Sequence, residues 1–267
     1  MGTTTGRDEG TDVPSTGPDP APDANSGTAG GSSVRRRRRG GGPIATAVGV
    51  FGELLITGGL VLGLFVVYSL WWTNVIADRQ ADRRADKVRH NWEASQPGDK
   101  GPGALDTGDG IGFLHVPSMR NGEVLVRRGT STDILNGGVA GYYTDPVKAT
   151  LPTTDKTGNF ALAAHRDGHG AKFHNIDKVD KGDPILFETK DDWYVYKVFA
   201  ILPETSKYNV QVLGSVPKQA GVKKPGHYIT LTTCTPVYTS RYRYVVWGKL
   251  VRVDKVDADR TPPKELD

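Results

Sequence analysis

A single cysteine lies at the end of a stretch whose residue types suit a β-strand. Residues 228–233 are mostly β-branched and aromatic, so successive side chains should alternate between faces, with Thr230, Thr232 and Cys234 on the same one. A second such stretch begins at Arg241 and Arg243, which share one face. The sequence therefore predicts a thiol at the end of one strand and two guanidinium groups at the start of the next.

A thiol in this setting needs two helpers to carry out acyl transfer. An ordinary cysteine has a pKa of about 8.5, so it becomes a good nucleophile near neutral pH only beside a cation. A histidine can supply protons and an arginine can stabilise an oxyanion. His165 is the best-placed histidine, because it ends the apolar run 159–164 and opens a glycine-rich loop. The other five lie in a charged segment, inside a strand, at the far end of the cysteine's strand or farther along the loop: His90, His115, His227, His169 and His174.

Two other interpretations of the cysteine stay open on these residues alone. A lone cysteine is often a small buried apolar side chain. Cys234 could also bind zinc with His165, His169 or His174, although one cysteine without a CxxC spacing is a poor start for such a site. We expect no metal and no cofactor.

Composition excludes several classes of protein. The 267 residues carry a net charge of +4, and much of the basic excess comes from five consecutive arginines, residues 35–39. The remaining charge is too dispersed for a nucleic-acid interface, which needs clustered basic side chains. One cysteine also excludes an intrachain disulfide. The folded part must therefore be stabilised by its own hydrophobic core, for which the residues from 104 onward are numerous enough.

The N-terminal third predicts a tail, a membrane span and a stalk. Residues 1–43 are poor in large apolar side chains and end near the arginine cluster, so we expect a disordered cytoplasmic tail. Residues 44–72 contain 19 consecutive uncharged positions, 54–72, and lack a cleavage signal afterwards, which predicts an uncleaved signal-anchor. The arginines before it place the N-terminus inside the cell and the rest outside. Residues 73–103 then suggest an exposed stalk, helical at first and broken by glycine and proline, with no core to join.

From residue 104 to 256 the sequence predicts one all-β domain, followed by a charged tail at 257–267. Short apolar runs alternate with turn pairs such as Asn121-Gly122, Asn136-Gly137 and Lys181-Gly182, which is typical of a barrel or sandwich of seven or eight strands. We expect only brief helical turns, near residues 133–135 and 174–176. The candidate strands are residues 111–116, 123–127, 159–164, 184–189, 192–201, 228–233 and 242–253.

The motifs around the cysteine and the histidine resemble those of sortases, the cysteine transpeptidases of Gram-positive cell walls. Thr230-Leu-Thr-Thr-Cys234 followed by Arg243 is similar to the family's TLxTC…R signature. The run from residue 159 to His165 resembles the strand that ends in the family's histidine, and residues 111–117 resemble its first barrel strand. The resemblance covers roughly residues 110–253. It implies a sortase-type β-barrel of about eight strands on an N-terminal membrane helix.

The resemblance also implies roles for individual residues. Cys234 would be the nucleophile, His165 the acid and base, and Arg243 the group that stabilises the oxyanion or positions the substrate. Arg241 shares the face of Arg243, and only the spacing of nine residues from the cysteine favours the latter. Three further residues are candidates for substrate binding: Tyr142, Thr233 and Arg241. Tyr142 stands where many sortases have histidine, so either a hydrogen bond to the substrate or simple packing would explain it.

The implied substrates are secreted proteins with a C-terminal LPXTG-like sorting signal, cleaved between Thr and Gly and passed to an amine of a peptidoglycan precursor. The sequence is most similar to class E sortases of actinobacteria, for which LAXTG is the expected signal. Two alternatives remain open. A pilin-polymerising sortase would often carry a lid and a C-terminal membrane helix, and a non-catalytic sortase-like module would bind the signal without needing a reactive thiol.

Overall fold

The computed structural model describes residues 42–94, 108–154 and 156–266. The chain divides into two compact units, residues 1–53 and 54–267. Residues 1–41 of the expected disordered tail and all of the glycine- and proline-rich break at residues 96–103 lie outside the described residues. The features that bear on function belong to the second unit.

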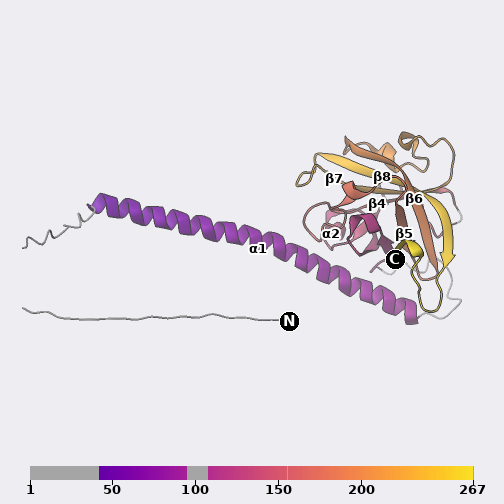
Figure 1. Cartoon of the computed structure of the whole chain (residues 1–267), viewed down its shortest axis with the longest axis horizontal. Helices are drawn as coiled ribbons and strands as arrows, with labels where there is room; N and C mark the ends of the chain where they lie inside the picture. Colours follow the sequence, from indigo (N-terminus) through magenta and orange to yellow (C-terminus); the bar gives the residue numbers. More distant parts are fainter. Residues whose placement is uncertain (1–41, 95–107, 155, 267) are drawn as a thin grey trace, which may run out of the picture. The chain divides into compact units, whose positions relative to one another are not determined.

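Eight strands close into a barrel in the order β1-β2-β3-β4-β7-β8-β6-β5 (Figure 1). Two neighbouring pairs, β2 with β3 and β4 with β7, are parallel, and the others are antiparallel. Closure leaves no unpaired sheet edge, which is how many small all-β domains avoid aggregation. The strands are β1 (Gly112–His115), β2 (Glu123–Arg128), β3 (Ala140–Tyr142), β4 (Gly158–Ala163), β5 (Pro184–Glu188), β6 (Asp192–Ser206), β7 (His227–Thr235) and β8 (Tyr242–Lys255).

The barrel confirms the predicted fold class and seven of its strands. The strand missing from the prediction is β3, which has only three residues and therefore too short a pattern to recognise. The brief helices also fall near their predicted positions, as α2 (Thr132–Leu135) and the 3₁₀ turn η2 (Ile176–Lys178). Further 3₁₀ turns are η1 (Pro117–Met119), η3 (Val210–Leu213), η4 (Lys218–Ala220) and η5 (Lys264–Leu266).

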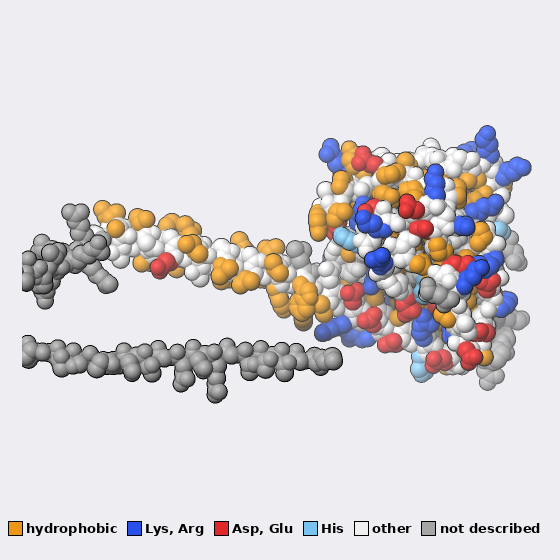
Figure 2. Space-filling model, in the orientation of Figure 1, with side chains coloured by type: hydrophobic (Ala, Val, Ile, Leu, Met, Phe, Trp, Pro, Cys, Tyr) orange, Lys and Arg blue, Asp and Glu red, His pale blue; other side chains and the backbone are white. Residues whose placement is uncertain are grey.

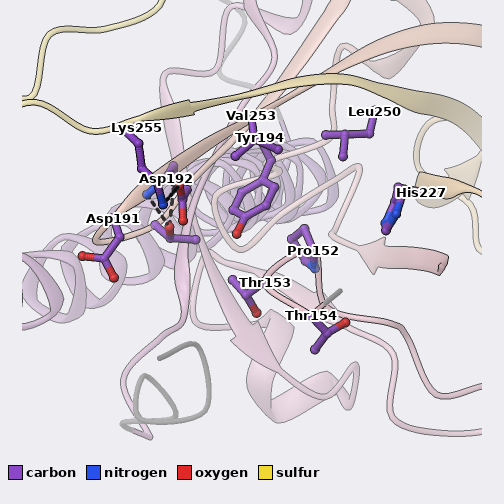
Figure 3. Close-up of a pocket in the computed structure, with 11 residues that line it drawn as sticks. Pro152, Thr153, Thr154, Asp191, Asp192, Tyr194, His227, Leu250, Val253 and Lys255 are labelled. Carbon is purple, nitrogen blue, oxygen red and sulfur yellow. Dashed lines mark hydrogen bonds and ion pairs between the residues drawn. The ribbon is translucent and has the colours of Figure 1, made fainter. Parts of the chain in front are cut away.

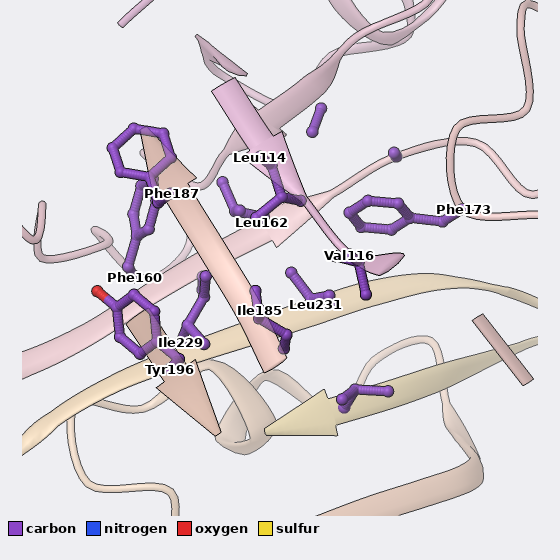
Figure 4. Close-up of a cluster of buried hydrophobic side chains, with 14 of the residues drawn as sticks. Leu114, Val116, Phe160, Leu162, Phe173, Ile185, Phe187, Tyr196, Ile229 and Leu231 are labelled. Carbon is purple, nitrogen blue, oxygen red and sulfur yellow. The ribbon is translucent and has the colours of Figure 1, made fainter. Parts of the chain in front are cut away.

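Alternate side chains of the strands fill the barrel interior (Figure 4). On β7, Ile229 and Leu231 are fully buried in this core, while Thr230 between them points to the other face. Phe160 of β4 packs edge-on against Phe187 of β5, with ring centroids 4.8 Å apart. Burying a side chain of this size contributes about 2 kcal/mol. The core thus fixes β4 and β7, whose ends carry the candidate histidine and cysteine.

One long helix, α1 (Pro43–Ala94), contains the predicted span and the predicted stalk as far as residue 94. Hydrophobic side chains dominate the helix before its charged C-terminal part (Figure 2), with Glu53 as an exception. Among the described residues, α1 is the one helix that is apolar and long enough to cross a membrane. The expectation of an exposed stalk is wrong for the C-terminal part of α1. Ala81, Val88 and Trp92 are buried with Phe113 and Leu125 of the barrel.

Ion pairs reinforce this contact between the C-terminal half of α1 and the barrel. Arg89 bonds to Glu188 at 3.2 Å and also pairs with Glu123, and Trp92 stacks edge-on against Phe113 at 5.4 Å. Small residues and a single aromatic form most of the buried face, so the apolar signal in the sequence is weak. The folded domain therefore includes part of the segment that was expected to be a linker.

The C-terminal residues 257–267 also pack on the barrel where the structure describes them. Leu266 contacts the small cluster formed by Leu186, Trp193 and Val195. Glu265 accepts two hydrogen bonds of 2.6 Å from Arg252, and Arg260 bonds to Glu188 at 2.6 Å. The segment is charged, as the sequence indicates, but its charges are used to hold it against the barrel.

Candidate active site

The pairing of β7 with β8 places the cysteine directly opposite one of the two candidate arginines. Cys234 and Arg243 are cross-strand partners, and Arg241 precedes the strand and is exposed. Side chains directly opposite each other in an antiparallel pair have Cβ atoms about 5 Å apart. The pairing thus separates two arginines that share one face in the sequence pattern, and it agrees with the residue spacing in placing Arg243 opposite the thiol.

Backbone carbonyl groups orient the Arg243 side chain. One terminal nitrogen, Nη1, donates hydrogen bonds to the carbonyl oxygens of Ser240 at 3.2 Å and Tyr242 at 3.0 Å. Arg241 instead lies over the ring of Tyr242, with 5.4 Å between its guanidinium carbon and the ring centroid. Carbonyl groups carry no net charge, so these hydrogen bonds do not neutralise the guanidinium group opposite Cys234. Cys234 itself is a half-buried free thiol.

The parallel pairing of β4 with β7 brings the histidine to the same place. Ala163 of β4 aligns with Thr232 of β7. Extended by two positions beyond the last pair, this register places His165 opposite Cys234, and neighbouring strands lie about 4.8 Å apart. The Thr233 hydroxyl donates a 2.7 Å hydrogen bond to the carbonyl oxygen of Ala164 and extends the contact beyond the ladder. Thr233, a candidate for substrate binding, is 3% exposed and ties the two strands together.

A buried arginine stabilises the loop that follows His165. Arg166 is 6% exposed and donates hydrogen bonds to Thr235 Oγ1 at 3.0 Å and to Asp177 at 3.0 Å. Its guanidinium carbon also lies 5.7 Å from the ring centroid of Tyr244. These contacts connect the end of β4 to the end of β7 and to β8, so His165 and Cys234 are held by the same network.

An asparagine that sequence analysis missed contacts the histidine. Nε2 of His165 lies 2.8 Å from Oδ1 of Asn136, which follows helix α2. Because an amide oxygen can only accept, this contact makes Nε2 the protonated nitrogen and leaves Nδ1 for the reaction. Asn136 was noted only as part of a turn pair with Gly137. Nothing in the sequence links it to a residue 29 positions away.

The surroundings of His165 favour its neutral form. Burial lowers its pKa below the ordinary value, and the nearby His169, a second potential cation, lowers it further, while Asp167 acts in the opposite direction. The two imidazole centroids are 5.5 Å apart. A lowered pKa favours the neutral imidazole, which is the form that takes up a proton.

Of two adjacent tyrosines, the structure places one in the core and the other at the site. Tyr142, the candidate for substrate binding, is 7% exposed and packs near Phe160, with ring centroids 6.4 Å apart. Tyr143 contacts the strand that carries the thiol: its hydroxyl lies 2.9 Å from Thr232 Oγ1, two residues before Cys234. Burial raises the Tyr143 pKa, with Cys234 adding to the increase and Arg243 opposing it. Tyr143 therefore stays protonated and can act as a hydrogen-bond donor.

The cluster of residues that could hold a metal ion lies away from Cys234, and arginine side chains already pair with it. Within the described residues, the one cluster of three possible ligands is His115, Glu123 and Glu188. Arg89 and Arg260 both bond to the Glu188 carboxylate, so cationic side chains already occupy this position. The zinc alternative built on Cys234 and neighbouring histidines finds no such cluster in the described part of the chain.

A cavity of about 550 Å³ opens at the other end of the barrel (Figure 3). His227 at the start of β7 lines it, seven residues before Cys234, together with Tyr194 and the ion pair of Asp192 with Lys255 at 2.7 Å. A strand rises about 3.3 Å per residue, so this cavity lies roughly 20 Å from the thiol. It takes no part in the chemistry of Cys234.

Comparison with known proteins agrees with this geometry. Residues 114–251 match the model of the sortase domain. The chain is 75% identical over 225 residues to the sortase SrtE2 of Streptomyces coelicolor, covering 83% of this chain and 89% of that protein. It is 46% identical over 211 residues to SrtE1 of the same organism, covering 79% of this chain and 59% of that protein.

Solved structures give the same result for the barrel. A crystal structure of sortase E1 from Streptomyces coelicolor, with a tripeptide in its active site, superposes with a TM-score of 0.55 at 46% identity and covers 59% of this chain and 96% of that one. Sortase E from Streptomyces avermitilis superposes with a TM-score of 0.52 at 28% identity, covering 59% and 97%. The chain therefore belongs to the sortase family of cysteine transpeptidases, and its relatives are the class E members.

Proposed function

We propose that this protein cleaves an LAXTG- or LPXTG-type sorting signal between Thr and Gly and transfers the cleaved protein to an amine of a peptidoglycan precursor. The observation that carries the proposal is the convergence of Cys234, Arg243 and His165 from three separate segments at one end of the barrel. Because the relatives are class E sortases, we expect LAXTG to be the preferred signal. The tripeptide in the active site of the related sortase E1 agrees with a peptide substrate.

In the first half of the proposed reaction, the Cys234 thiolate attacks the carbonyl carbon of the signal's threonine. The carbonyl oxygen becomes an oxyanion, and the cationic Arg243 opposite the thiol stabilises it. His165 gives the proton of Nδ1 to the nitrogen of glycine, which leaves as an amine when the C–N bond breaks. Cys234 then holds the substrate as a thioester.

In the second half, the acceptor amine attacks the thioester carbonyl. His165, now neutral, takes the proton that the amine loses as the new amide bond forms and the thiolate leaves. Tyr143, beside Cys234 and Arg243, replaces Tyr142 as the tyrosine suited to donate a hydrogen bond to the signal. Thr233 supports the site through the backbone of Ala164, and exposed Arg241 can bind the signal only at its rim.

The proposed location is the outer face of the cell membrane. Helix α1 would cross the bilayer once, with the arginine cluster and N-terminus in the cytoplasm and the barrel outside, where secreted proteins and peptidoglycan precursors meet.

The test is a ligation assay. Residues 74–267 are incubated with LAETG or LPETG peptides and an amine acceptor, and the products are identified by mass spectrometry. We expect a peptide cut after Thr and joined to the amine, with LAETG consumed faster. Binding without cleavage would favour a non-catalytic module, and ligation only to a pilin lysine would favour a pilin-polymerising enzyme.

A further inference from the structure

Strand directions identify which loops share the catalytic end of the barrel. The C-terminal ends of β4, β6 and β7 lie there, because β4 is parallel to β7, and β8 runs antiparallel to both β6 and β7. The loop after β4 contains His165 and Gly170. The hairpin between β7 and β8 contains Tyr238, and Tyr208 follows directly after β6.

Helix α1 reaches this same end immediately after its apolar stretch. The strongly apolar stretch ends at Trp72, although uncharged residues continue to Ala77, and the Asn74 side chain accepts a 2.9 Å hydrogen bond from the backbone N–H of Gly170. Asp78 then pairs with Lys172 at 2.9 Å. A helix rises 1.5 Å per residue, so Trp72 and Asn74 differ by about 3 Å along the axis. The apolar stretch therefore ends beside the loop that carries the catalytic histidine.

The contact continues along the helix and cannot act as a hinge. Gly138, in the loop that carries Asn136, packs against the backbone of Ala77 so closely that a Cβ would lie 2.8 Å from the carbonyl oxygen. Farther along the helix, Arg89 and Trp92 contact Glu188 and Phe113 of the barrel. Attachments over some 18 residues, about 27 Å of helix, fix the direction of the barrel relative to this part of α1.

The same end exposes aromatic side chains. Tyr238 is 85% exposed and Tyr208 is 77% exposed, the largest values among the aromatic residues of the barrel. Exposed Lys207 and Arg241 lie beside them in sequence, and the Lys207 ammonium is 5.2 Å from the ring centroid of Tyr208. Tyrosine with neighbouring basic residues is the composition that favours the interface of a lipid bilayer, where rings lie among the headgroups.

From these observations we infer that the catalytic end of the barrel rests on the lipid surface, with Tyr208 and Tyr238 in the headgroup region and helix α1 fixing that orientation. The inference rests on the proposed membrane anchor. A site held there would meet a sorting signal or a lipid-linked acceptor that is itself attached to the membrane. The opposite end of the barrel, with the cavity of His227, would point away from the lipid.

The test uses the full chain reconstituted in lipid vesicles. In a Cys234→Ala background, Tyr238→Cys and Asp191→Cys each carry one fluorophore, the second as a matched control in the exposed turn at the opposite end of the barrel. We expect quenchers attached to lipid headgroups to quench the label at 238 several-fold more than the label at 191. Soluble iodide should show the reverse order.

A second arm tests the role of the helix. Inserting about twelve Gly and Ser residues after Thr73 leaves the span and the barrel intact but allows the barrel to turn freely. The difference between the two labels should then disappear, and a difference that survives would contradict the role of α1. Flotation distinguishes the two proposals: protein that fails to float with vesicles overturns the membrane anchor. Floating protein whose labels are equally accessible to iodide overturns the inference made here.

Discussion

The two ends of the barrel both carry ionisable side chains, but they differ in what these side chains bind. At the end opposite the thiol, Glu188 bonds to Arg89, Arg260 and His115, and Asp192 pairs with Lys255. At the catalytic end, Arg243 bonds to neutral carbonyl groups.

The difference shows which charges can do chemistry. A charge that is fully paired stabilises the fold and has little left to offer a substrate, whereas an arginine held only by neutral dipoles can still stabilise an oxyanion. The charges around Glu188 are thus used for stability, whereas Arg243 remains available for reactivity. Variants at the two ends should separate the two properties, and the expected effects follow in decreasing order of free energy.

Removing the histidine at the catalytic end should have the largest effect. His165→Ala removes the acid and base of both half-reactions, so we expect kcat/KM for ligation to fall about 10³-fold. His227→Ala, at the opposite end of the strand that carries Cys234, is the matched control and should keep near-normal activity. Comparable losses in the two variants would remove the distinction between the ends.

Arg243→Ala should lower kcat by about 10²-fold, because it removes the cation opposite the thiol. Arg241→Ala is the control two residues away and should change kcat by only a few-fold. Steady-state kinetics with one peptide substrate measure both. Retained turnover in Arg243→Ala would contradict the assignment.

Glu188→Gln should affect stability and spare catalysis. The carboxylate is 3% exposed, and burial alone would raise its pKa, but hydrogen bonds from His115, Arg89 and Arg260 outweigh burial and lower the pKa to about 2. A depressed pKa contributes stability above the ordinary value of 4.5 that is lost as pH falls toward 2.

We therefore expect the free energy of unfolding in urea to fall by about 2 kcal/mol at pH 7, and the difference from wild type to shrink as the pH is lowered. Arg243→Gln should show the opposite pattern, with stability kept and activity lost. An equal loss of stability in both variants would contradict the comparison.

Asn136→Ala should lower kcat about tenfold by freeing the ring of His165. Asn136→Asp keeps an acceptor at the same position and should recover part of the activity while shifting the pH profile, which a merely structural role would not produce. The profile of kcat/KM for the three proteins measures both effects.

His169→Ala should have the smallest effect, a shift in pH dependence. Removing this potential cation raises the pKa of His165, so the imidazolium that protonates the leaving amine persists to higher pH. The alkaline limb of the kcat/KM profile should move upward. His90→Ala, on the exposed side of α1, is the control, and an unchanged limb in His169→Ala would exclude the interaction.

Sequence alone predicted the parts of this molecule that depend on local pattern. Alternation on the strand of Cys234 predicted that the thiol shares a face with Thr230 and Thr232, and the motifs singled out His165 and Arg243. Contacts between segments that are distant in the sequence could not be predicted from local pattern. Asn136 meets His165 through a loop, and Tyr143, next to the tyrosine singled out by the motif, is the one beside the thiol.

The docking of helix α1 was missed for a different physical reason. Its buried face consists largely of alanines, with Val88 and Trp92 as the main large side chains, so the hydrophobic periodicity is faint. Polar contacts of Asn74, Asp78 and Arg89 also hold the helix against the barrel, and each has a partner far away in the sequence. A charge-rich helix can therefore pack against a folded domain even when its sequence has no apolar stripe from which the packing could be predicted.

Direct observation of the covalent intermediate tests the central claim, that Cys234 is the nucleophile of a site completed by His165 and Arg243. Residues 74–267 are mixed with LAETG peptide without an amine acceptor, quenched in acid and mapped by mass spectrometry. The account predicts a thioester on Cys234 carrying the peptide up to Thr, absent in Cys234→Ala and resolved when the amine is added. A peptide that is cleaved with no adduct on Cys234, or no cleavage at all of either LAETG or LPETG, would contradict it.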